Sequence, residues 1–173
     1  GLNTFFTAYQ ESTGKELWKT DGTADGTVMV KDIHPSIYAI INNFNFLGTN
    51  LFFTADDGTH GSELWKSDGT ETGTVMVKDI RPGNLKSSPV PQIRHGGYLY
   101  FTANDGTHIE GLWKTDGIEA VTVMVKDINP SGKSYASDFT VMGSVLYFRA
   151  TDGVNGVELW RSDGTETGTY MIR

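Results

Sequence analysis

The chain has 173 residues and a formal net charge of −7, with 21 glycines and no cysteine. The lack of cysteine excludes disulfides, thiolate metal sites and cysteine nucleophiles. The acidic charge and the missing basic run argue against nucleic acid as a partner, because that binding depends on clustered Lys and Arg. No apolar stretch approaches the roughly 20 residues that span a bilayer, which argues against membrane insertion.

The dominant feature of the sequence is a fourfold repeat, in which each unit carries a Leu-Trp pair. The tryptophans are Trp18, Trp65, Trp113 and Trp160, at steps of 47, 48 and 47 residues. Self-similarity at a period of this size indicates a solenoid, a propeller or an array.

The second unit shows the strands that we expect in every repeat. In chain order they are residues 43–47, 51–55, 63–67 and 74–80. These runs are rich in β-branched and aromatic residues and lie between Gly, Asp and Pro. Asp-Gly pairs between them favour tight hairpins, because glycine adopts positive φ readily. Three short turns and one long connection per unit predict a four-stranded antiparallel meander.

The strand around Val28-Met29-Val30 and its copies are apolar on both faces, which predicts that each sheet is covered on both sides. Sheets stacked in this way are the blades of a β-propeller, whose four-stranded blades have about this period. We therefore expect an all-β protein: a β-propeller built from four ~47-residue four-stranded blades, one of them incomplete. An open array of the same sheets is the alternative.

The repeat also predicts where each blade begins and ends. We expect a single repeat domain over residues 1–173, with blades at 1–35, 36–82, 83–130 and 131–173. Inner strands are expected near 44–47, 90–94 and 139–142, so the first blade lacks its inner strand. Two explanations remain open: the chain is a fragment of a longer repeat protein, or a ring that closes imperfectly or is completed by another chain.

The segment from Glu63 to Ile80 reads Glu-Leu-Trp-Lys-Ser-Asp-Gly-Thr-Glu-Thr-Gly-Thr-Val-Met-Val-Lys-Asp-Ile. It resembles the ELWxxDGTxxGT-type repeat of large secreted or surface proteins of bacteria, and the resemblance covers essentially the whole chain. It implies a propeller-like architecture and a secreted or cell-surface location, but no catalytic residues. The third unit departs from the pattern, with Gly111, Ile118 and Val121 in place of Glu, Thr and Gly.

Two sets of residues are candidates for chemistry as well as for structure. The four tryptophans are either sugar-stacking platforms or core anchors, and their place in mid-strand favours the core. The acidic loop of the second unit is a weak calcium candidate through Asp56, Asp57 and Glu63. It lacks EF-hand spacing, and Asp in such a loop usually caps its own turn. We therefore assign no cofactor and keep calcium as an alternative.

The leading functional hypothesis is a non-enzymatic binding module with equivalent, lectin-like sites on several blades. Weak sites repeated on one body gain through multivalency, and a glycan is the preferred partner, with a surface protein as the alternative. The candidate contacts are Asp57, His60, Asp105, His108, Asp152 and Asn155.

Two other functions stay open. One is a structural spacer or interaction repeat of a large bacterial surface protein. The other is a propeller hydrolase or lyase, which the sequence disfavours because it offers neither an asymmetric acidic cluster nor a nucleophile elbow.

Overall fold

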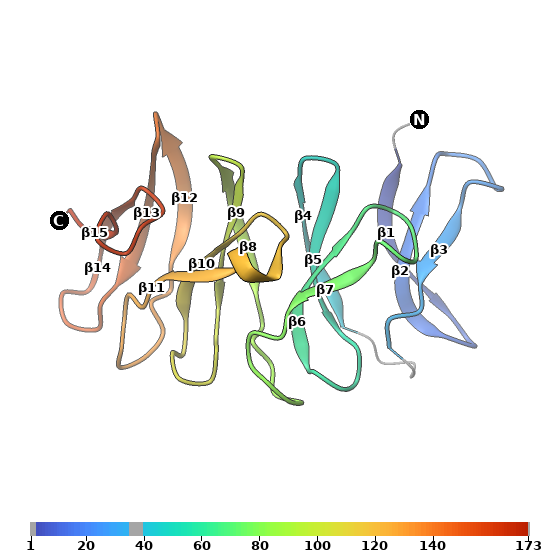
Figure 1. The fold of residues 1–173 in the computed structure, drawn as a ribbon, viewed down its shortest axis with the longest axis horizontal. Helices are drawn as coiled ribbons and strands as arrows, with labels where there is room; N and C mark the ends of the chain where they lie inside the picture. The colour runs from blue at the N-terminus through green and yellow to red at the C-terminus, as the bar shows by residue number, and fades with distance from the viewer. Residues whose placement is uncertain (1–2, 35–39, 173) are drawn as a thin grey trace. The chain divides into compact units, whose positions relative to one another are not determined.

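The computed structural model describes residues 3–34 and 40–172, which form antiparallel sheets (Figure 1). The strands are β1 (Thr4–Gln10), β2 (Gly14–Thr20), β3 (Val28–Lys31), β4 (Ile41–Leu47), β5 (Asn50–Asp56), β6 (Ser62–Ser67), β7 (Val75–Lys78), β8 (Val90–His95), β9 (Tyr98–Ala103), β10 (Gly111–Thr115), β11 (Val123–Lys126), β12 (Ser137–Met142), β13 (Val145–Thr151), β14 (Val157–Ser162) and β15 (Tyr170–Met171). A single turn of 3-10 helix, η1 (Glu119–Val121), precedes β11. No helix in the described ranges is long and apolar enough to cross a membrane.

Each repeat forms one sheet whose strands follow in chain order. The first sheet is β1-β2-β3, the second β4-β5-β6-β7, the third β8-β9-β10-β11 and the fourth β12-β13-β14-β15. The predicted antiparallel meanders are confirmed, including a first sheet with one strand fewer than the others. The outer strand of the second sheet is shorter than the predicted 74–80: β7 begins at Val75 and ends at Lys78.

The chain forms two compact units, residues 1–88 and 89–173, and each contains two sheets. In the first unit, Leu17, Val30 and Ile33 of the first sheet share a core with side chains of the second sheet. The residues that the second sheet supplies are Ile41, Leu51, Phe53, Ala55 and Trp65. In the second unit, Leu112, Val125 and Ile128 of the third sheet pack in the same way on the fourth sheet, which supplies Ala136, Leu146, Phe148, Ala150 and Trp160.

Burial on both faces falls on a different strand from the one predicted. In β5 the five residues from Leu51 to Ala55 are all buried. The outer strands instead leave their first valine at the surface: the exposed fractions of Val28, Val75 and Val123 are 40%, 38% and 40%. The expectation that Val28-Met29-Val30 is covered on both faces is therefore wrong, since an outer strand is flanked by solvent along one edge.

The Asp-Gly-Thr motif is a turn that satisfies its own polar groups. In the second sheet, Asp68 Oδ1 accepts bonds from the Thr70 backbone N–H (2.9 Å) and hydroxyl (2.7 Å). Thr70 Oγ1 in turn accepts the Gly73 N–H at 2.9 Å, and Thr74 Oγ1 donates to the Thr70 carbonyl at 2.6 Å. The turns at Asp21 and Asp163 repeat this pattern. An Asp side chain that bonds the backbone two residues on is an Asx-turn, which explains the motif structurally.

The third sheet shows what happens when the motif changes. Glycine in the motif leaves room for the aspartate: a Cβ at Gly73 would overlap the Asp68 carboxylate. Val121 takes the equivalent place in the third sheet, where the chain forms η1 instead. There Asp116 Oδ1 accepts the Ile118 N–H at 2.9 Å.

Replacing Gly73 by alanine therefore disrupts the turn of the second sheet. We expect Gly73→Ala to lower the free energy of unfolding by about 1–3 kcal/mol, because the new methyl group displaces the Asp68 carboxylate. Chemical denaturation measures this loss. Val121→Ala is the matched control and should cost less, since η1 already accommodates a side chain there. Equal losses in the two variants would contradict this account of the motif.

Candidate functional site

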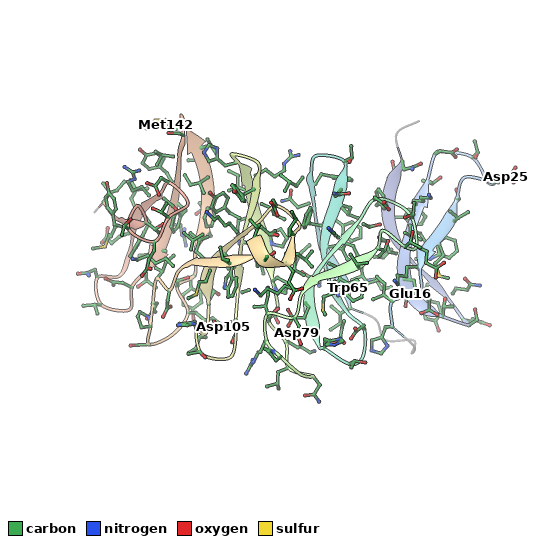
Figure 2. The ribbon with its side chains drawn as sticks, viewed as in Figure 1. Glu16, Asp25, Trp65, Asp79, Asp105 and Met142 are labelled. Atoms are coloured by element: carbon green, nitrogen blue, oxygen red, sulfur yellow. The ribbon has the colours of Figure 1, made fainter. Side chains whose placement is uncertain are left out.

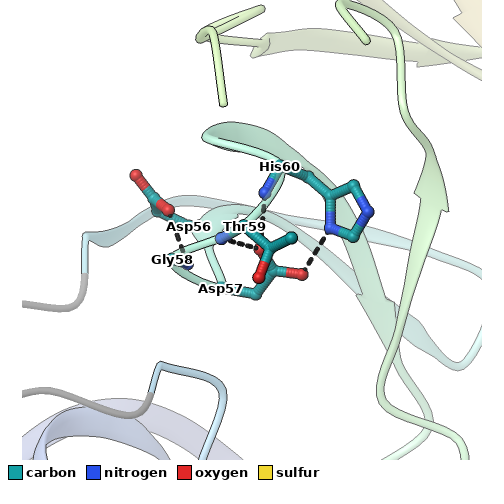
Figure 3. A network of polar contacts seen from close by, with 5 residues as sticks. All are labelled: Asp56, Asp57, Gly58, Thr59 and His60. Carbon is teal, nitrogen blue, oxygen red and sulfur yellow. Dashed lines mark hydrogen bonds and ion pairs between the residues drawn. The ribbon is translucent and has the colours of Figure 1, made fainter. Parts of the chain in front are cut away.

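The loop after β5 holds the first predicted ligand contacts, Asp57 and His60, in one tight network (Figure 3). Asp57 Oδ1 accepts the backbone N–H groups of Thr59 and His60, both at 2.8 Å. Asp57 Oδ2 lies 2.7 Å from Nδ1 of His60. The neighbouring Asp56 accepts the Gly58 N–H at 2.8 Å. These carboxylate oxygens are thus directed into the loop that carries them.

The other predicted contacts repeat this arrangement in their own sheets. Asp105 Oδ1 accepts the N–H groups of Thr107 and His108, and its Oδ2 lies 2.8 Å from His108 Nδ1. In the fourth sheet Asp152 accepts the Asn155 N–H at 2.8 Å and the Asn155 side-chain amide at 2.6 Å. The six predicted residues therefore form three pairs, each within a single turn.

In the two pairs that contain a histidine, the aspartate and the histidine shift each other's pKa. Burial raises the pKa of Asp57, but hydrogen bonds from the backbone and side chain of His60 outweigh it and hold that pKa below its ordinary value. The hydrogen bond to Asp57 raises the pKa of His60. Asp105 and His108 shift in the same directions for the same causes. Because Nδ1 of each of these partly exposed histidines is held by the carboxylate, Nε2 is the ring nitrogen that the aspartate does not engage.

A second polar network lies inside the sheets, around glutamates that head the Glu-Leu-Trp motif. Glu63 is fully buried, and its Oε2 accepts the Ile80 N–H at 3.0 Å and the Ser87 hydroxyl at 2.6 Å. Its Oε1 accepts the Arg81 N–H at 3.3 Å. Glu16 is also fully buried and accepts the Ile33 N–H at 2.8 Å.

Burial sets the protonation of these two glutamates. Desolvation raises the pKa of Glu63 to about 7, against the opposing effect of the bonds from Ser87, Ile80 and Arg81. Desolvation likewise raises the pKa of Glu16 to about 7. Both carboxyls therefore titrate near neutral pH, well above their ordinary range.

The sequence analysis considered Glu63 only as a weak calcium ligand and missed its partner Ser87. A signal was present, because Ser134 recurs 47 residues after Ser87. In the third sheet, where Gly111 replaces the glutamate, Glu110 stands one residue earlier and its Oε1 accepts the Ser134 hydroxyl at 3.0 Å. The serine therefore keeps a carboxylate partner although the glutamate has moved.

The calcium candidates direct their oxygens to protein donors. Asp56 and Asp57 bond their own loop, and Glu63 bonds the chain beyond β7. Within residues 3–34 and 40–172, no three His, Cys, Asp or Glu side chains are grouped so that they could hold a metal ion.

The tryptophans lie within strands β2, β6, β10 and β14 rather than in loops, and Figure 2 labels Trp65 among the side chains of the second sheet. Trp65, Trp113 and Trp160 are 6%, 7% and 5% exposed, and Trp18 is only partly buried. Side chains this deeply buried leave little ring surface on which a sugar could stack.

Comparison with known proteins identifies the fold. No protein-family model matches the chain, and no curated protein sequence matches it. Among solved structures it is similar to a puromycin hydrolase S511A mutant complexed with PGG, with a TM-score of 0.62, 16% identity, and coverage of 99% of this chain and 27% of that chain. It is similar to oligopeptidase B from Leishmania major, with a TM-score of 0.59, 14% identity, and coverage of 98% and 25%. A study of two prolyl endopeptidases supplies a third structure, with a TM-score of 0.59, 11% identity, and coverage of 99% and 26%.

The matched regions are β-propeller domains, so the chain has the fold of a β-propeller domain. The chain spans about a quarter of the length of these structures. Identities this low show the fold alone. A closed ring of four blades stays a prediction.

The buried glutamate predicts a distinct pH dependence of stability. The pKa of Glu63 is about 7 in the fold, above the 4.5 of an ordinary glutamate, so the folded state binds this proton more tightly. Its contribution to stability is complete at low pH and is lost as the pH rises through about 7. The stability of the wild type relative to Glu63→Gln should therefore fall between about pH 5 and about pH 8, by about 1.4 kcal/mol per unit of pKa difference.

Urea unfolding of both proteins across this pH range measures the effect. Glu71→Gln, which removes an exposed carboxylate from a turn, is the control and should track the wild type. Parallel curves for the wild type and Glu63→Gln would show that the buried carboxyl does not titrate as described.

The pairing of Asp57 with His60 predicts a second titration effect. In Asp57→Asn the side chain keeps an acceptor for the backbone but loses its charge, so the pKa of His60 should fall toward the ordinary value of 6.5. NMR of the imidazole signals against pH measures this. Asp105→Asn is the matched control, since it should lower the pKa of His108 and leave that of His60 unchanged. An unaltered His60 titration in Asp57→Asn would refute the pairing.

Proposed function

We propose that this chain is a non-enzymatic β-propeller module that acts as a structural interaction repeat. The observation that carries the proposal is the use of the motif's polar side chains within the fold. Asp68 and Thr70 build their own turn, and Glu63 bonds the chain that follows its sheet. A motif that repeats because it builds each sheet supports a role in construction and contact rather than in one chemical reaction.

The surface that such a repeat offers to other molecules includes exposed apolar side chains. Exposed apolar residues gather on the fourth sheet and its loops, among them Val154, Val157 and Leu159 at 87%, 54% and 45% exposure. Exposed apolar patches often mark contacts with other proteins. The resemblance of the repeat to that of large bacterial surface proteins supports a secreted or cell-surface setting for this module.

A lectin-like function is a second candidate, and the histidine pairs favour it. Asp57 and Asp105 hold His60 and His108 in the same orientation in two sheets, with Nε2 of each ring turned away from the aspartate. Such oriented rings are equivalent polar groups that a repeated ligand, such as a glycan, could contact on two sheets at once. Calcium is a candidate cofactor only for this lectin-like function, in which the acidic loops would bind it.

A glycan array with soluble-sugar competition separates the two functions. The interaction-repeat proposal predicts no sugar-dependent binding and no shift of the melting temperature with glycans, in calcium or in chelator. Binding that free sugar abolishes, and that His60→Ala with His108→Ala weakens steeply, would overturn the proposal in favour of the lectin. Tyr9→Ala, which alters an exposed aromatic residue of the first sheet, is the matched control for the two histidine changes.

A further inference from the structure

The leucine of the Glu-Leu-Trp motif is covered in three sheets and uncovered in the fourth. Leu17, Leu64 and Leu112 are fully buried, whereas Leu159 is 45% exposed. The outer strand behaves in the same way: Val30 and Val125 are 5% and 4% exposed, but Ile172 at the equivalent place is 41% exposed. The fourth sheet therefore carries the apolar face of the repeat without the side chains that cover it elsewhere.

The structure shows twice what covers this face. Leu17 packs on the second sheet, where Leu51, Phe53 and Trp65 belong to its core cluster. Leu112 packs on the fourth sheet in the same way, where Leu146, Phe148 and Trp160 take the equivalent places. In both cases the cover consists of alternate residues of the second strand of a sheet, together with the tryptophan paired to it.

The first sheet carries the equivalent of this covering surface. Phe6 pairs with Trp18 across β1 and β2, as Phe53 pairs with Trp65. Thr4, Phe6 and Trp18 are exposed or only partly buried, whereas their counterparts in the second sheet are buried. The face on the fourth sheet and the surface on the first thus correspond to the two sides of the contact that occurs inside each unit.

A polar contact accompanies the apolar contact between the two sheets of each unit. Lys19 Nζ donates to the Gly69 carbonyl of the next sheet at 2.7 Å, and Lys114 Nζ donates to the Gly164 carbonyl at 2.9 Å. Phe5 and Tyr100 lie against these two glycines. Gly22, the equivalent glycine of the first sheet, has no such neighbour within 4 Å of its Cβ position. Arg161, which follows Trp160 as Lys19 follows Trp18, is the cation that would reach it.

We propose that two copies of this chain associate head to tail, with the fourth sheet of one copy docked on the first sheet of the other. Leu159 and Ile172 of one copy cover Phe6 and Trp18 of the other, and Arg161 donates to the Gly22 carbonyl. This names the partner in the proposed interaction function and rests on that function. The contact joins different surfaces of identical chains, so it is heterologous and forms a ring or a filament.

Sedimentation velocity over a wide range of protein concentration tests this contact. The wild type should pass from monomer to larger species as concentration rises. Leu159→Asp and Thr4→Arg should each stay monomeric, because a charge then enters the apolar contact from one side. Both residues are exposed, so neither change disturbs the fold of the chain. Ile109→Asp, on an exposed loop residue of the third sheet, is the matched control and should associate like the wild type.

Mixing the two monomeric variants gives a sharper test. Thr4→Arg keeps an intact fourth sheet and Leu159→Asp keeps an intact first sheet, so the mixture should associate although neither variant does alone. A wild type that stays monomeric at every concentration would overturn the inference, as would a Leu159→Asp chain that associates normally. A mixture that fails to associate would refute the head-to-tail arrangement.

The two proposals fail in different ways. Sugar binding by a chain that still associates overturns the interaction-repeat function alone. A monomeric chain that binds no sugar overturns head-to-tail association alone, and other surface proteins would then be the partners of the repeat.

Discussion

A carboxylate buried inside a β-sheet must be given hydrogen-bond donors, and this requirement organises the first two repeats, where Glu16 and Glu63 are fully buried. An unpaired charge or polar group in the interior costs several kcal/mol, whereas a bonded one is tolerated. Glu63 meets the requirement by accepting the Ile80 and Arg81 N–H groups and the Ser87 hydroxyl. The third strand of the sheet is thereby tied to the long connection that leads out of it. The Ile80 N–H, which lies just beyond the end of β7, is thus bonded to a side chain rather than to a neighbouring strand.

The packing of one sheet on the next explains the leucine, the lysine and the Asp-Gly-Thr turn of the motif. The leucine faces the next sheet of its unit, as Leu17 and Leu112 do, and the lysine two residues later reaches the glycine carbonyl of that sheet's turn. The Asp-Gly-Thr turn must hold that carbonyl in place, which it does by bonding its own polar groups. One sheet of this kind cannot bury its apolar face alone, so the repeat is stable only when neighbours stack.

The architecture was predictable because its signals are local and repeated. Strand positions followed from aromatic and β-branched runs between Asp-Gly turns, and the period indicated a repeat architecture such as a propeller. The burial of individual strands was not predictable in the same way. The sequence Val28-Met29-Val30 predicts a strand covered on both faces, yet Val28 is 40% exposed. The residues of a strand do not by themselves show whether it lies at the edge of its sheet.

The candidate site was predicted in part. The acidic loops were found, and their role as turn caps was one of the two readings that the sequence left open. Neither the burial of Glu63 nor its bond to Ser87 was foreseen, since a glutamate between Ser and Leu in a strand reads as a solvent-facing residue. Only the three-dimensional structure shows that a distant serine supplies its partner.

The most direct measurement of the central claim is residue-resolved amide hydrogen exchange of Ile33 and Ile80. These N–H groups lie outside the regular strands and are bonded to the carboxylates of Glu16 and Glu63. The account predicts that both exchange slowly, like strand amides, and that Glu63→Ala exposes the Ile80 amide while the Ile33 amide stays protected. Fast exchange of both amides in the intact protein would contradict the claim that buried glutamates organise the repeat.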